Sequence, residues 1–108
     1  MGIKGTVVQH ARVIVISARD NVATALDPLS AGATIDVDGL SILVREAIAG
    51  GHKIAITRIA AHEAVIKYGS PIGTATTDIE PGAHVHTHNV ASARGRGDLV
   101  ASPSKETP

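Results

Sequence analysis

Three histidines alternate with other residues in the run His84-Val85-His86-Thr87-His88-Asn89. In an extended strand, residues two apart point to the same face, so the three imidazoles would line one side. Neutral imidazoles suit Zn, Fe, Ni or Cu. Two imidazoles at i and i+2 can share one metal, whereas three on a flat strand span too far for all to bind it easily. We therefore expect His86 and His88 to be the metal ligands, with His84 held in reserve.

Asn89, at the end of this run, could hydrogen-bond a substrate or orient an imidazole, as groups around a metal site commonly do. We count it among the candidate catalytic residues. The alternative reading of the whole run is a solvent-exposed polar edge that binds nothing. Residue spacing alone leaves both readings open.

A second segment with chemical potential is Gly50-Gly51-His52-Lys53. A glycine pair lets the backbone approach a ligand closely, His52 could hold a metal or a proton, and Lys53 is the best candidate cation for a carboxylate. The alternatives are an ordinary turn and a solvated lysine. If the two segments form one site, His52 or Lys53 must lie within reach of His86 or His88.

These segments belong to a short unit that occurs four times: an aliphatic residue, two residues, a glycine (once a histidine), two residues and another aliphatic. Glycine permits positive φ, and the flanking aliphatics can hold the turn against a core. Each copy therefore predicts a tight turn that leads into a strand. The four copies are Leu29–Ile35, Ile48–Ile54, Ile59–Val65 and Ile79–Val85.

The rest of the chain supplies the elements that must position these turns. Arg12–Ser17 is apolar on both faces and predicts a buried strand. Asp20–Leu26 predicts a short helix, capped by Asp20 or Asn21 and ended by Asp27-Pro28.

Asp38-Gly39, between two apolar runs, is typical of a hairpin with a type I′ turn. Further strands are expected over 54–59, 65–68 and 72–77. We expect one domain over residues 1–90 and a flexible tail over 91–108, which is rich in Gly, Ser and Pro.

Composition narrows the function classes. The 108 residues suffice for one domain with one modest core, and without Phe or Trp that core must be aliphatic. Ten basic and ten acidic residues cancel, which disfavours nucleic-acid binding. The absence of cysteine excludes disulfides and thiolate sites. No apolar run approaches the roughly 20 residues needed to cross a bilayer, so we expect no membrane association and a cytoplasmic protein.

Several motifs occur together in an order that resembles a known family. GHKIA, VIKYGSPIGTATTDI and GAHVHTHN, with DNVATAL at 20–26, are similar to the small N-terminal domain of the altronate dehydratase family, over roughly residues 12–89. That domain is of the SAF type, and the resemblance implies a mainly β, β-clip fold with one short helix. The chain ends soon after HTHN, which resembles the separately encoded small subunit of some members, including the sulfolactate sulfo-lyases.

The resemblance implies a lyase subunit that acts on a hydroxy acid, such as altronate, another sugar acid or sulfolactate. The reaction would remove a proton next to a carboxylate and then eliminate water or sulfite, helped by a divalent metal, iron by family resemblance. A domain of this size would need a large catalytic subunit as partner. Two alternatives remain: a non-catalytic carbohydrate-binding module, and a scaffolding subunit whose exposed strand edges pair with other chains, including copies of itself.

Overall fold

The computed structural model describes residues 7–92, and within this range every regular element is a β-strand. The predicted mainly β architecture is confirmed. No helix that could span a membrane occurs in the described range. Ten short strands follow one another along the chain: β1 (Val7–Val8), β2 (Val13–Ile14), β3 (Val22–Ala25), β4 (Ala33–Val37), β5 (Leu40–Leu43), β6 (Lys53–Ala55), β7 (Ala64–Lys67), β8 (Ser70–Ala75), β9 (His84–Val85) and β10 (Val90–Ser92).

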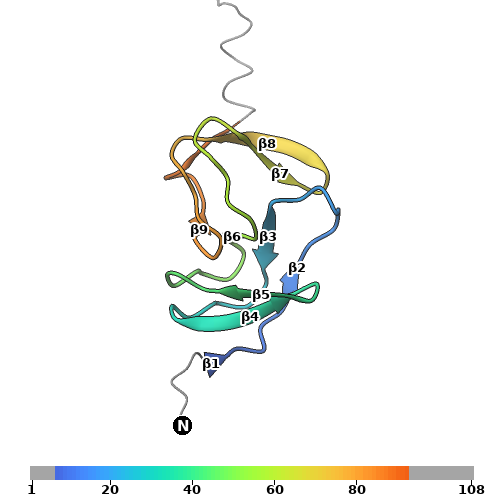
Figure 1. Ribbon diagram of the computed structural model, residues 1–108, viewed down its shortest axis with the longest axis vertical. Helices are drawn as coiled ribbons and strands as arrows, with labels where there is room; N and C mark the ends of the chain where they lie inside the picture. The colour runs from blue at the N-terminus through green and yellow to red at the C-terminus, as the bar shows by residue number, and fades with distance from the viewer. Residues whose placement is uncertain (1–6, 93–108) are drawn as a thin grey trace, which may run out of the picture.

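The strands form three small sheets, ordered β1-β4-β5, β2-β3-β6-β9 and β10-β8-β7. Among the strands of residues 7–92, only the β1–β4 pair is parallel. The β4–β5 and β7–β8 hairpins lie at opposite ends of the domain, with the four-stranded sheet between them (Figure 1). Segments far apart in sequence, β6 and β9, are therefore neighbours in the middle of the molecule.

All four predicted turn units adopt the same local structure. The central residues Gly32, Gly51, His62 and Gly82 have φ between 74° and 89°, the left-handed region that glycine tolerates best. The first aliphatics of the units pair two by two, Leu29 with Ile48 and Ile59 with Ile79, each through reciprocal backbone hydrogen bonds of 2.8–2.9 Å. The repeat is thus a structural unit used four times.

The same pairing divides the apolar interior into two cores. The first and second units place their aliphatics, Leu29, Ile35, Ile48 and Ile54, in one cluster. The third and fourth units place theirs, Ile59, Val65, Ile79 and Val85, in the other. All eight side chains are buried. We expected one core, and the chain builds two because each hairpin closes over its own pair of turns.

Both hairpins turn through two residues with positive φ. Asp38 and Gly39 have φ of 53° and 82°, as a type I′ turn requires, so the predicted hairpin is confirmed. Tyr68 and Gly69 repeat this geometry between β7 and β8, with φ of 57° and 77°. A tyrosine in the left-handed region costs free energy, so tertiary contacts must hold it there.

The predicted helix over Asp20–Leu26 is wrong. Val22–Ala25 forms β3, paired with β2 on one side and β6 on the other. Asp20 is buried and does not cap a helix: its carboxylate accepts hydrogen bonds from the backbone N–H groups of Ile16, Ser17 and Gly69. Two preceding residues and the distant Gly69 satisfy the side chain that was expected to start the helix.

Two other boundaries differ from the expectation. The predicted strand over 12–17 is regular only at Val13–Ile14, and Ile16 is 66% exposed because the chain bends there toward Asp20. Strand β10 includes Ala91 and Ser92, which pair with Thr74 and Gly73. The remainder of the predicted tail, residues 93–108, lies outside the described part of the chain.

Candidate metal centre

The pairing of β6 with β9 brings the two chemically promising segments together. Lys53 lies opposite Val85, and Ile54 lies opposite His84. Continuing this register by one residue places His52 opposite His86, and their rings stack with centroids 3.9 Å apart. The expectation that His52 or Lys53 lies within reach of His86 or His88 is confirmed.

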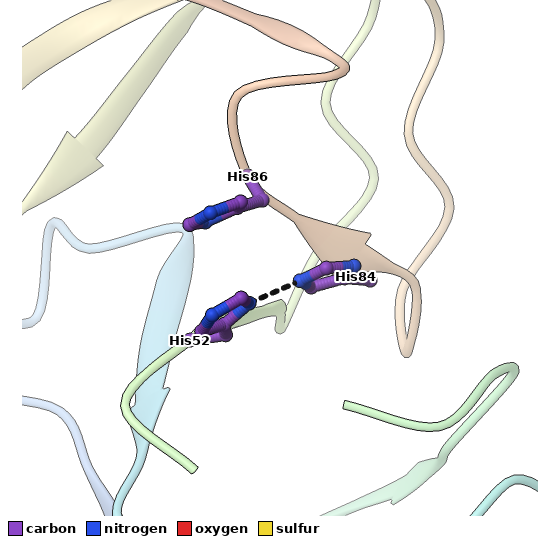
Figure 2. A group of neighbouring side chains, drawn as sticks. All are labelled: His52, His84 and His86. Carbon is purple, nitrogen blue, oxygen red and sulfur yellow. Dashed lines mark hydrogen bonds between the residues drawn. The ribbon is translucent and has the colours of Figure 1, made fainter. Parts of the chain in front are cut away.

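Three imidazoles form a compact group, which we call the histidine triad: His52, His84 and His86 (Figure 2). One ring nitrogen from each lies within 4.8 Å of the others. His52 enters from the turn before β6, His84 from β9, and His86 from just beyond the end of β9. The three rings are nearly parallel, with interplanar angles of 11–17°.

A short hydrogen bond links two members of the triad. Nδ1 of His52 lies 2.8 Å from Nε2 of His84, so one nitrogen donates and the other accepts. Nδ1 of His86 is buried and has no hydrogen-bond partner among the described residues. A buried polar atom without a partner is unfavourable, so this nitrogen is suited to bind a ligand.

The electrostatics favour the neutral form of two triad imidazoles, those of His84 and His86. Burial lowers the pKa of His84, and the neighbouring rings of His52, His88 and His86 lower it further, against the opposing effect of the Glu46 carboxylate. Burial likewise lowers the pKa of His86, with His52 and Lys53 adding to the effect. Neutral imidazole is the form that binds a metal.

The donor set fits a divalent transition metal. All three donors are imidazole nitrogens, which suit Zn, Fe, Ni and Cu. Nitrogens bound at about 2.1 Å to one tetrahedral Zn lie about 3.4 Å apart. The triad nitrogens all lie within 4.8 Å of one another, so side-chain movement of about 1 Å would bring all three to one ion. The unpartnered Nδ1 of His86 is a further sign that the residues fit such an ion.

His88 and Asn89 occupy different places from the triad. Strand β9 ends at Val85, and residues 86–89 turn, with the Asn89 N–H donating to the His86 carbonyl at 3.2 Å. This turn leaves His88 exposed, with its ring centroid 5.1 Å from that of His84. The structure thus groups His86 with His52 and His84, and places the other predicted ligand, His88, outside this triad.

Asn89 is buried and binds the backbone of its own loop. Its Oδ1 accepts from the His86 N–H at 2.9 Å, and its Nδ2 donates to the His84 carbonyl at 2.9 Å. Both polar ends of the side chain are therefore occupied by the segment that carries the histidines. This geometry matches the orienting role considered for Asn89, exerted through the backbone.

One contributor to the site carried no local signal in the sequence, and a second was ranked below its neighbours. Glu46, in the loop between β5 and β6, accepts a 3.1 Å hydrogen bond from the His84 N–H. His84 itself was held in reserve because three imidazoles on one flat strand cannot share an ion easily. Knowledge of the β6–β9 register would have identified both His52 and His84 as partners of His86.

Comparison with known proteins places this geometry in a family. Residues 11–93 match the family model described as the altronate/galactarate dehydratase SAF domain. The chain belongs to this family. The triad and Lys53 all lie within the matched region.

Individual relatives agree with this assignment. The chain is 51% identical to an altronate dehydratase of Escherichia coli over 76 residues, which are 70% of this chain and 15% of that protein. It is 43% identical to a Bacillus subtilis altronate dehydratase over the same share of both chains. It is also 39% identical to the (2R)-sulfolactate sulfo-lyase subunit alpha of Paracoccus pantotrophus over 61 residues, which are 56% of this chain and 91% of that subunit.

The chain thus spans a small part of the altronate dehydratases it matches, whereas the matched region makes up nearly all of one sulfo-lyase subunit. The family context is that of lyases. The name "subunit alpha" implies that those sulfo-lyase relatives work in an assembly of more than one chain.

Proposed function

We propose that this chain is the SAF component of a lyase that acts on a hydroxy acid, and that its histidine triad holds a divalent metal. The observation that carries the proposal is the convergence of His52, His84 and His86, one ring nitrogen of each within 4.8 Å of the others, beside the half-buried Lys53. Family membership supplies the reaction class.

Iron is the metal that the family resemblance suggests, and the imidazole donors suit it. When bound, a divalent ion would supply a Lewis acid for the carboxylate and hydroxyl oxygens of the substrate. This chain's own residues position the metal-binding histidines. Asn89 and Glu46 hold the backbone that presents His84 and His86, and the lowered pKa values of these two histidines keep their rings neutral near pH 7.

A neutral ring nitrogen can also accept a proton from carbon next to a carboxylate. His52 would take this role in an arrangement where His84 and His86 hold the ion and a nitrogen of His52 stays free, with its Nδ1 contact to His84 orienting the ring. We propose that removal of that proton is followed by loss of water or sulfite, a product class suggested by the relatives' names, dehydratase and sulfo-lyase.

A larger polypeptide is the second part of the proposal. The triad is only partly buried, and the described residues offer few further groups to enclose a substrate. The match to 15% of an altronate dehydratase is consistent with a domain that works beside a much larger region. We infer that a large catalytic subunit completes the site, and that altronate, another sugar acid or sulfolactate is the substrate.

The test combines metal analysis with reconstitution. The full chain would be purified without oxygen, supplied with Fe²⁺, and mixed with the remainder of an altronate dehydratase or with the partner subunit of a sulfolactate sulfo-lyase. We expect about one metal ion per chain, and elimination activity that His86→Ala abolishes. Activity that is unchanged in the variant would leave a scaffolding role, and no activity with any hydroxy acid would favour a carbohydrate-binding module.

A further inference from the structure

A cavity of about 220 Å³ adjoins the triad on the side of β8 and β10. Six residues line it: Lys53, Ile72, His86, Thr87, Val90 and Ser92. His86 is the only residue shared with the triad, so this side chain forms the boundary between the two. Any group in the cavity therefore lies next to the histidines.

Lys53 supplies the charge of the cavity. In β6 it lies opposite Val85, which belongs to the second core, and the partly buried Ile72 and Val90 pack against that same core. The aliphatic part of a lysine can lie along such apolar surface while its ammonium group reaches a polar opening. The cavity offers Lys53 both surroundings: the aliphatic side chains of Ile72 and Val90, and the hydroxyl-bearing residues Thr87 and Ser92.

No carboxylate compensates this ammonium group among residues 7–92. The ion pairs of that range join Arg12 to Asp27, and Arg58 to Asp78 and Glu80. Burial disfavours its charge, and the nearby Lys67 ammonium repels it. A half-buried cation near a second cation, with no carboxylate partner in the described range, is costly, and an anion in the cavity would relieve that cost.

We infer that this cavity binds the anionic end of a small organic acid, with Lys53 as its counter-ion and His86 as the link to the triad. The inference deepens the proposed function, since the acid would be the lyase's substrate. The Lys53 ammonium is a compact point charge and can pair with a carboxylate or a sulfonate. The shared chemistry is a singly charged, oxygen-rich end group.

The size of the cavity limits what enters it. Small-molecule sites usually measure about 300–1,000 Å³, so 220 Å³ accepts a three-carbon acid or one end of a six-carbon sugar acid. The aliphatic walls of Ile72 and Val90 do not match a chain of hydroxyl groups. A longer acid would therefore place its charged end here and extend its hydroxylated part toward the triad and the partner.

Anion binding to the full chain can be measured by amide chemical-shift titration, first with chelator present and then with Zn²⁺. The probes are glycerate as a carboxylate, isethionate as a sulfonate and glycerol as a neutral control. We expect the glycerate shifts to centre on residues 53, 72 and 86–90 even without metal. Shifts with isethionate alone would assign the cavity to sulfonates.

Three variants make the test specific. Lys53→Met keeps the aliphatic stem without the charge and should weaken glycerate binding about tenfold or more, as expected for a hydrogen bond to a charged group. Lys53→Arg should keep most of the affinity. Arg19→Gln is the matched control, because Arg19 is exposed and does not line the cavity; its effect should stay below about threefold.

Equal binding by Lys53→Met and the wild type, or equal shifts with glycerol and glycerate, would overturn the inference. Because the first arm uses metal-free protein, it is independent of metal binding by the triad. Metal binding with no Lys53-dependent anion binding would refute the cavity alone. Anion binding without any metal binding would refute the metal proposal and leave the cavity in place.

Discussion

The rings of His52 and His86 stack with their centroids 3.9 Å apart, although one residue precedes β6 and the other follows β9. This contact results from the antiparallel register in which Lys53 lies opposite Val85. It joins the glycine-rich turn to the histidine run, and it places the cavity beside Lys53 at the edge of the triad.

The first prediction concerns which histidines bind metal. His52→Ala and His86→Ala should each weaken Co²⁺ or Zn²⁺ binding by well over about tenfold, since even changes outside the ligand shell cost about 10–100-fold. His88→Ala is the matched control and should bind almost normally, because His88 is exposed and lies outside the triad. Competition with a chromogenic chelator measures each affinity. A large loss in His88→Ala, with none in His52→Ala, would instead support the His86–His88 pair predicted from the sequence.

The second prediction concerns Asn89, which is buried and binds the backbone at both His84 and His86. Asn89→Ala removes both hydrogen bonds and should lower the free energy of unfolding by about 1–3 kcal/mol. It should also weaken metal binding, because His86 loses the group that holds its backbone. Asn89→Asp keeps the acceptor for the His86 N–H and should retain more of both properties. Urea unfolding together with metal titration gives the two readouts; unaltered metal affinity in Asn89→Ala would contradict the positioning role.

The third prediction concerns acid stability. Burial opposes the charged form of Asp20, but hydrogen bonds from the backbone N–H groups of Gly69, Ser17, Tyr68 and Ile16 outweigh it and lower the pKa of this carboxyl group. A carboxyl with a lowered folded-state pKa contributes stability that is complete above its unfolded pKa of about 3.9 and is lost as the pH falls through the folded value.

We therefore expect the wild-type melting temperature to fall steeply below about pH 4. Asp20→Asn should melt several degrees lower at pH 7 and show a weaker dependence on acid, because an amide offers one acceptor where the carboxylate offers two. Thermal melts from pH 7 to pH 2 test this, with Asp38→Asn in the exposed hairpin turn as control. Parallel pH profiles of Asp20→Asn and the wild type would show that Asp20 does not cause the acid sensitivity.

The fourth prediction separates backbone strain from steric overlap at the repeated turns. Gly32 and Gly82 have nearly equal φ values of 86° and 89°, so alanine is strained equally at both. A Cβ at Gly32 meets open space, whereas a Cβ at Gly82 would overlap the Leu43 carbonyl oxygen. Gly32→Ala should cost about 1–2 kcal/mol of unfolding free energy, and Gly82→Ala clearly more. Equal costs in chemical denaturation would show that the Leu43 backbone moves freely away.

Local chemistry in the sequence was enough to predict much of this protein. Gly32, Gly51 and Gly82 mark three of the four turns because a left-handed residue is a property of the single position. Asp38-Gly39 predicts its hairpin for the same reason. The aliphatic residues around each turn predict burial, and the shared motifs identify the family without any knowledge of contacts.

Tertiary structure decided what depends on partners far along the chain. The sequence predicted Asp20 as a helix cap. In the structure its carboxylate precedes a strand and accepts a hydrogen bond from the N–H of Gly69, which is distant in sequence. The histidine run looked like one flat face, but β9 ends at Val85, so His88 turns outward while His86 meets His52. Sequence spacing predicts which residues share one face of a strand. Which residues of other strands lie beside that face depends on strand register, and the packing of the whole domain sets that register.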